Sequence, residues 1–179
     1  FYTRHTRITS WRLTGAVALM SAVLLFSFLF ARFGNEKMDY MTTGDVNALG
    51  RLYATANPGA LLVGLTSDMP WKYKDFEQYH YATVLDLDEA QQARVFAQHD
   101  LGAILRLMHG RGGAPSYLVI TRSQEAQLQL FYGVSAGQIQ RLDGALVHSS
   151  KLRMIYNDGT DRIFVPRAQG TTGRNRTID

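Results

Sequence analysis

The residues of this chain that are best suited to bind a ligand lie in one aromatic stretch, residues 69–81. The stretch contains five aromatic side chains and two lysines. Aromatic faces stack on sugar rings and ammonium groups hold anionic headgroups, so the composition predicts contacts with a glycan or a lipid headgroup. The candidate contact residues are Trp71, Lys72, Tyr73, Lys74 and Tyr79. The alternative is that the rings only pack this loop onto its own domain or onto a membrane interface.

The other residue types that support chemistry are scattered along the chain. Five histidines show no spacing that would place two of them on one helix face as metal ligands. The chain has no cysteine, which excludes a disulfide scaffold, a thiolate metal site and a cysteine nucleophile. The acidic cluster at residues 86–89 is expected to cap a helix, and the glycine-rich loop 110–113 follows a predicted helix, the reverse of a phosphate-binding loop. We therefore expect no catalytic residue, no metal and no cofactor in this chain.

The positive charge is confined to the beginning of the chain. The 179 residues carry 19 Lys and Arg against 15 Asp and Glu, a formal net charge of +4. Residues 1–33 contain four arginines and no acidic residue, so residues 34–179 have no net charge. A neutral domain, in which Asp75 and Glu77 also offset the two lysines of the aromatic stretch, argues against nucleic acid as a partner.

A run without any charged residue, residues 13–31, predicts a membrane-spanning helix. At about 1.5 Å per residue the run covers roughly 28 Å, which matches the hydrocarbon thickness of a bilayer. Trp11, Arg12 and Arg32 flank it as expected membrane-interface anchors. We place the transmembrane helix at residues 13–33, with the lipid bilayer as a partner. A cleaved signal peptide and a buried core helix are the alternatives, but the run is long, ends in bulky residues and is apolar on every face.

Charge also indicates how the chain is oriented and divided. Three arginines precede the helix and two basic residues follow it closely, so the positive-inside rule favours a cytoplasmic flank at residues 1–12. Residues 34–167 then form an extracytoplasmic domain, and residues 168–179 are expected to be a disordered tail because they lack an apolar face. Because the chain begins with Phe1, we expect it to be a fragment of a longer protein.

Within residues 34–167, strands alternate with helices. Strands are expected at 60–65, 79–85, 117–120, 151–156 and 162–165, and helices at 43–56, from Asp86 or Asp88 to 98, 100–108, 123–132 and 136–148. The wholly apolar run 60–65 is typical of a strand buried on both faces, and residues 157–159 predict a hairpin turn. The expected fold class is α/β: one N-terminal transmembrane helix, then a small three-layer domain with a mainly parallel sheet and a C-terminal antiparallel hairpin.

Several segments together resemble a known class of membrane proteins. They are the helix 43–56 leading through residues 57–59 into the first strand, the loop 69–73, the strand 117–122, and the closing pair 152–156 and 162–165. In this pattern the chain resembles the C-terminal part, the last transmembrane helix plus an extracytoplasmic α/β domain, of actinobacterial polytopic GT-C-type glycosyltransferase-like proteins. In that class the catalytic carboxylates lie near N-terminal membrane helices, so the resemblance assigns no catalytic residue to any position here.

The resemblance implies an accessory role in cell-envelope polysaccharide or glycolipid synthesis. The parent protein would be a glycosyltransferase dependent on a polyprenyl-phosphate sugar, and this piece would be non-catalytic. Its expected partners are upstream transmembrane helices or a neighbouring membrane protein, together with a glycan or a polyprenyl-linked sugar. The alternative is a single-pass, membrane-anchored interaction module that docks to another envelope protein and binds no sugar.

Overall fold

The computed structural model of the chain describes residues 10–33, 41–71, 74–110 and 114–167. The chain divides into two units, one before residue 41 that contains a single long helix and one after it that is a compact α/β domain. The predicted fold class is confirmed, from the N-terminal apolar helix to the mainly parallel sheet and the C-terminal antiparallel hairpin. The predicted tail, residues 168–179, lies outside the described residues.

Helix α1 (Ser10–Phe33) is long and apolar enough to cross a membrane. Every side chain from Trp11 to Arg32 is exposed, which argues against the alternative of a buried core helix. The interface anchors predicted from the sequence lie at the two ends of this helix. The Arg12 guanidinium carbon is 5.5 Å from the centroid of the Trp11 ring, and Arg32 lies in the last turn.

The domain is built on one five-stranded sheet with the order β2-β1-β3-β5-β4. Strands β1 (Leu61–Gly64), β2 (His80–Thr83) and β3 (Ser116–Ile120) are parallel, with β1 in the middle. Strand β5 (Arg162–Pro166) runs antiparallel to β3, and β4 (Leu152–Asn157) pairs antiparallel with β5 at the edge. The chain therefore places its last strand inside the sheet.

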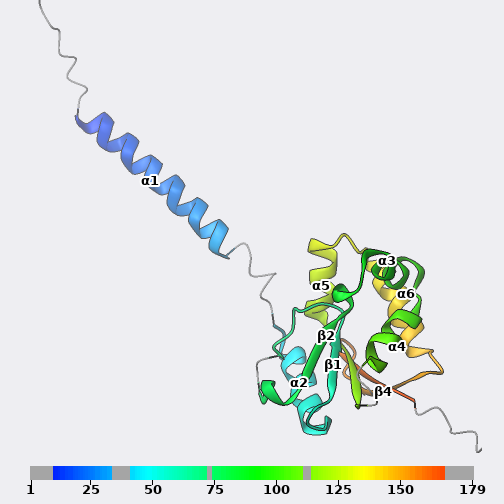
Figure 1. Cartoon of the computed structure of the whole chain (residues 1–179). Helices are drawn as coiled ribbons and strands as arrows, with labels where there is room; N and C mark the ends of the chain where they lie inside the picture. Colours follow the sequence, from blue (N-terminus) through cyan, green and yellow to red (C-terminus); the bar gives the residue numbers. More distant parts are fainter. Residues whose placement is uncertain (1–9, 34–40, 72–73, 111–113, 168–179) are drawn as a thin grey trace, which may run out of the picture. The chain divides into compact units, whose positions relative to one another are not determined.

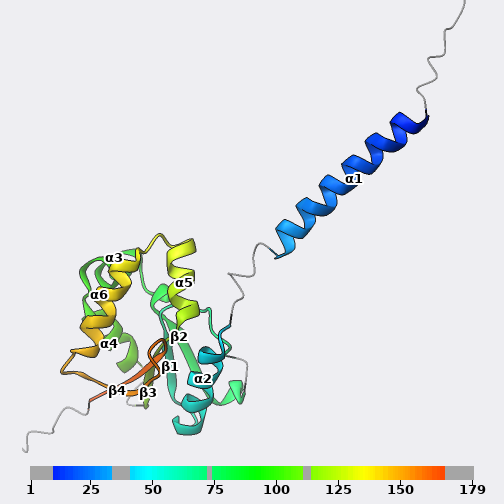
Figure 2. The same cartoon turned by 180° about the vertical axis from the view of Figure 1, so that it is seen from behind.

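Five α-helices and two short 3₁₀ turns complete the domain among the described residues. The α-helices are α2 (Thr43–Thr55), α3 (Glu89–Gln98), α4 (Leu101–His109), α5 (Arg122–Phe131) and α6 (Ala136–Val147). The 3₁₀ turns are η2 (Phe76–Gln78) and η3 (Val84–Asp86). Helix α2 covers one face of the sheet, whereas α3, α4 and α6 cover the other (Figures 1 and 2).

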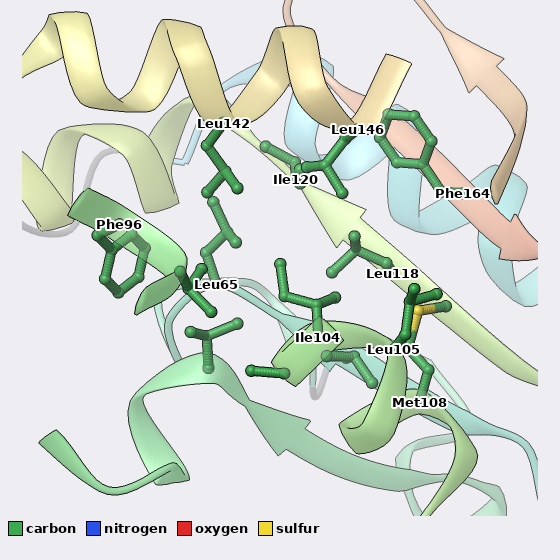
Figure 3. Close-up of a cluster of buried hydrophobic side chains, with 14 of the residues drawn as sticks. Leu65, Phe96, Ile104, Leu105, Met108, Leu118, Ile120, Leu142, Leu146 and Phe164 are labelled. Carbon is green, nitrogen blue, oxygen red and sulfur yellow. The ribbon is translucent and has the colours of Figure 1, made fainter. Parts of the chain in front are cut away.

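Two hydrophobic clusters, one on each face, hold these layers together. On the face of α4 and α6, buried leucines and isoleucines of both helices point at Leu118 and Ile120 of β3 (Figure 3). On the other face, side chains of α2 and of the aromatic stretch pack against Leu62 and Val119. Residues 60–66 are all buried, as the apolar run predicted for a central strand.

The structure shifts several predicted boundaries. Strand β2 ends at Thr83 rather than at residue 85, because η3 begins there and the Asp86 carboxylate accepts the Thr83 N–H at 2.6 Å. Asp88, one of the two predicted caps, caps α3 by accepting the Gln91 N–H at 2.8 Å. Helix α5 is capped by Thr121 rather than Ser123, so it begins earlier than predicted.

The predicted hairpin turn is present and is held by Asp158. The Asp158 Oδ1 atom accepts the backbone N–H groups of Asp161, at 2.7 Å, and of Thr160, at 3.0 Å. Burial would raise the pKa of this carboxyl, but these hydrogen bonds, with one from the Tyr156 hydroxyl, outweigh it and lower the pKa to about 2. The turn is therefore tightest when Asp158 is ionised.

Candidate functional site

An apolar groove of about 730 Å³ opens where strands β1 and β2 end. The carboxyl ends of parallel strands are the usual position of a ligand site in an open α/β sheet. Most of the lining comes from the aromatic stretch that the sequence singled out, and the rest from the start of α2 and the end of β2. The lining residues are Met41, Val46, Ser67, Met69, Pro70, Trp71, Phe76, Tyr81, Ala82, Thr83 and Asp86.

Three rings in mutual contact, one pair stacked and the other edge-on, form the aromatic part of the groove. The Tyr81 ring lies parallel to Phe76, with centroids 5.0 Å apart and planes at 13°, and meets Trp71 edge-on, also at 5.0 Å. The Tyr81 hydroxyl donates to the Phe76 carbonyl at 3.0 Å, which fixes the 3₁₀ turn against the strand. The stack is thus preorganised, so a ligand that packs on it does not need to order these rings first.

Trp71 is held in place from two sides. Its carbonyl accepts the Tyr53 hydroxyl at 2.6 Å, a buried hydrogen bond from α2, and burial of Tyr53 raises the pKa of that hydroxyl. Its ring lies against the backbone of Gly64, where a Cβ atom would come within 3.1 Å of Trp71 Cζ2. Only 9% of Trp71 is exposed, so most of its surface is packed within the domain.

The start of α5 supports the groove from behind, which the sequence analysis did not predict. Gln124 is fully buried and its Oε1 accepts the Leu65 N–H at 3.0 Å, while the Ser123 hydroxyl donates to the Asp68 carbonyl at 3.0 Å. Both contacts join residues more than fifty positions apart. A glutamine in a helix is normally expected to be solvent-exposed, so the local sequence does not indicate that Gln124 is buried and contacts Leu65.

The predicted contact residues have different surroundings. Trp71 lines the groove, whereas Tyr79 is buried beside it, with its hydroxyl donating to the Ala56 carbonyl at 3.3 Å and its ring centroid 5.2 Å from that of Tyr53. Burial, and then the nearby Asp75 carboxylate, raise the pKa of Tyr79. Lys74 is exposed. Lys72 and Tyr73 lie outside the described residues.

The described lining of the groove carries a single acidic side chain. Its acidic side chain, Asp86, already accepts the Thr83 N–H, and the described lining contains no histidine, cysteine or lysine that could act with it. Across the described ranges, no group of three or more His, Cys, Asp or Glu residues could hold a metal ion. The lining supplies an apolar, aromatic surface that includes the hydroxyl groups of Ser67, Tyr81 and Thr83.

Two buried carboxylates lie apart from the lining of the groove, at the N-termini of α2 and α5. Asp45 accepts the Thr42 N–H at 2.7 Å, and Asp161 accepts the Arg122 N–H at 2.9 Å. Both side chains are fully buried, and each has a second oxygen without a partner among the described residues. Burial raises the pKa of Asp161 to about 6, the Arg122 N–H opposes this, and the charge of Asp45 adds to it.

A smaller polar cavity of about 360 Å³ lies between α5, α6 and the hairpin turn. Arg162 bridges to Asp143 at 3.0 Å across it. Burial raises the pKa of both acids that face this cavity, Glu125 and Asp143; the negative charge of Asp143 raises that of Glu125 further, whereas Arg162 opposes the rise for Asp143. Its described lining balances two arginines against two carboxylates, and the ion pair of Arg162 with Asp143 ties β5 to α6.

Comparisons of the chain with protein-family models, with curated proteins and with solved structures found no match.

Proposed function

We propose that this chain is a membrane-anchored, non-catalytic binding domain that serves a glycosyltransferase-like membrane protein of the cell envelope. In this proposal the α/β domain is extracytoplasmic, and its groove holds a glycan or the lipid-linked sugar on which the parent enzyme acts. The observation that carries the proposal is the preorganised stack of Trp71, Tyr81 and Phe76 at the carboxyl ends of β1 and β2.

The chemistry of the groove supports a ligand with both an apolar part and a ring. Its floor is aromatic and aliphatic, which suits a sugar face or a hydrocarbon chain, and its rim carries hydroxyl groups of Ser67 and Thr83.

The test is binding of a polyprenyl-phosphate sugar and of envelope glycan fragments to the full chain in detergent micelles. The variant is Phe76→Ala with Met41→Ala, because both side chains line the groove without being fully buried. The matched control is Phe131→Ala with Leu130→Ala, which removes the same kinds of side chain from an exposed helix end. We expect about tenfold weaker binding for the groove variant and unchanged binding for the control. Equal affinity in both variants, or no binding by the unaltered chain, would refute the proposed role of the groove.

One observation favours the alternative function, docking to a neighbouring envelope protein. Leu130, Phe131 and Tyr132 follow one another at the end of α5 and are 54%, 50% and 51% exposed. Adjacent exposed apolar residues of this size are typical of contact surfaces. Crosslinking in native membranes tests this function. A protein partner that is captured by the unaltered chain and by the groove variant, but not after Phe131→Ala with Leu130→Ala, would establish docking as the better description.

The extracytoplasmic orientation has a separate test. Because the chain has no cysteine, Gln98→Cys introduces a single thiol at an exposed position on α3. Labelling of that thiol shows on which side of the membrane the domain lies. Labelling of intact cells by a membrane-impermeant maleimide is expected. Labelling only after the cells are opened would place the domain in the cytoplasm and overturn this part of the proposal.

A further inference from the structure

A second cavity, of about 490 Å³, gathers positive charge at the opposite edge of the sheet from the groove. It lies beside the C-terminal half of α4, the start of β4 and the end of β5, and β5 ends where the parallel strand β3 begins. Its polar lining consists of Arg106, His109, Ser150, Lys151 and Arg167, and no acidic residue belongs to the described lining.

The charges of this cavity are not used in ion pairs within the described chain. Over those residues the ion pair within 4.0 Å joins Arg162 to Asp143, which belong to the polar cavity at α5 and α6. Asp100 caps α4 near Arg106, but its Oδ1 accepts the Gly102 N–H at 2.8 Å and it forms no ion pair with Arg106. Three permanent positive charges therefore face one cavity, and the Asp100 carboxylate, which lies near Arg106 at Gly102, offsets only part of this charge.

Helix electrostatics explains only part of this arrangement. Arg106 and His109 lie in the last turn of α4, where positive charge is favourable. Lys151 and Arg167 come from other segments, before β4 and after β5, and the domain as a whole carries no net charge. Three of the fifteen Lys and Arg residues that follow residue 33 thus line one hollow, which gives it a local positive field that attracts anions.

Backbone contacts hold two of the basic residues close together. The Arg167 N–H donates to the Lys151 carbonyl at 2.8 Å, and the Arg167 Nε–H donates to the Leu152 carbonyl at 2.9 Å. These bonds join the two ends of the hairpin and orient the Arg167 side chain. Among the described residues, its Nη donors make no hydrogen bond. The cavity thus offers two guanidinium groups, of Arg167 and Arg106, and the ammonium group of Lys151. Together these donors suit the oxygens of a phosphate group.

We propose that this cavity is a binding site for a phosphate-bearing anion, with a diphosphate group as the best match to its three permanent charges. Arg106, Lys151 and Arg167 would neutralise the anion, and the Ser150 hydroxyl would donate to one of its oxygens. The site is distinct from the groove and goes beyond the proposed function. Its ligand is either a soluble diphosphate or the phosphate headgroup of a lipid.

Calorimetric titration of the full chain in neutral nanodiscs tests this site, with sodium pyrophosphate and dihexanoyl phosphatidic acid as separate probes. The variant is Arg106→Gln with Lys151→Gln, both exposed positions whose exchange leaves the core intact. The matched control, Arg94→Gln with Arg141→Gln, removes the same charge from exposed positions outside the cavity. We expect at least tenfold weaker binding for the cavity variant, near-normal binding for the control, and weaker binding at higher salt.

Each outcome decides the matter. Binding of pyrophosphate that the cavity variant loses supports a soluble ligand, and binding of phosphatidic acid alone, lost in the same variant, supports a lipid headgroup. Failure of both probes to bind, or equal losses in the cavity variant and the control, overturns the proposal. The groove variant, Phe76→Ala with Met41→Ala, should bind pyrophosphate normally, so failure of the groove function and failure of this site are distinguishable.

Discussion

Replacing Asp161 by asparagine should stabilise the domain at neutral pH. Asp161 is fully buried, and its pKa in the folded chain is about 6, compared with an ordinary value of 3.8. The unfolded chain therefore releases this proton at a lower pH than the folded chain does. Stability is unaffected by this group below about pH 4, falls as the pH rises through about 6, and then stays constant.

The magnitude follows from the difference between the two pKa values. At about 1.4 kcal/mol for each pH unit, the ionised side chain costs the folded state about 3 kcal/mol at pH 7.5. Asp161→Asn removes the charge and keeps an oxygen that accepts the Arg122 N–H. For a domain of this size, about 3 kcal/mol corresponds to roughly 10 °C in Tm.

The assay is thermal unfolding of the full chain in detergent micelles, followed by circular dichroism between pH 3.5 and 8. The variant should melt roughly 10 °C above the unaltered chain at pH 7.5, and the difference should shrink to about a third at pH 4.5 and vanish near pH 3.5. Asp143 titrates in both proteins. The charge of Asp161 also raises the pKa of Glu125, so its removal lowers that pKa and adds to the stabilisation in the same direction. Asp88→Asn is the control, because Asp88 is exposed and asparagine caps a helix equally well. A variant that is less stable at pH 7.5, or a difference that does not depend on pH, would refute the reasoning.

Three further outcomes are expected from the same unfolding assay. Gly64→Ala should destabilise the domain by about 2 kcal/mol, because its Cβ atom would lie 2.7 Å from the Thr66 carbonyl oxygen and 3.1 Å from the Trp71 ring. The control is Gly50→Ala, which has open space around it and should stabilise the domain by roughly 0.5–1 kcal/mol. Equal effects of the two substitutions would contradict the close packing at Gly64. Tyr53→Phe should cost about 1–2 kcal/mol, since it leaves the buried Trp71 carbonyl without its donor, and an unchanged Tm would argue against that bond. Asp158→Ala should lower Tm at pH 7 and have no effect near pH 2, because the stabilisation by this carboxylate is lost as the pH falls from about 4 through about 2.

Local patterns were sufficient to predict most of the fold. The uncharged run 13–31, the wholly apolar run 60–65 and the turn residues 157–159 each act through neighbours in sequence, and each corresponds to an element in the structure. The observed boundaries differ from the predicted ones where two residues could each cap a helix: Thr121, rather than Ser123, caps α5. Both residues are good helix caps, and only the end of β3 decides between them.

The candidate site was predictable in its place but not in its construction. The aromatic stretch could be placed at the carboxyl end of β1 because it directly follows that strand in the sequence. The burial of Tyr79 and the support from Gln124 depend on contacts between residues distant in sequence, which periodicity does not encode. The basic cavity was missed for the same reason, since Arg106, Lys151 and Arg167 are far apart along the chain.

The place of β5 inside the sheet has a consequence for how this protein is made. Strand β5 is the last element of the domain, yet it pairs with β3 on one side and with β4 on the other. During synthesis, β3 therefore keeps an open edge, and β4 has no strand to join, until Arg162–Pro166 has emerged. A chain interrupted before residue 162 exposes unpaired backbone to chaperones and proteases, so the topology lets the cell distinguish finished copies from truncated ones.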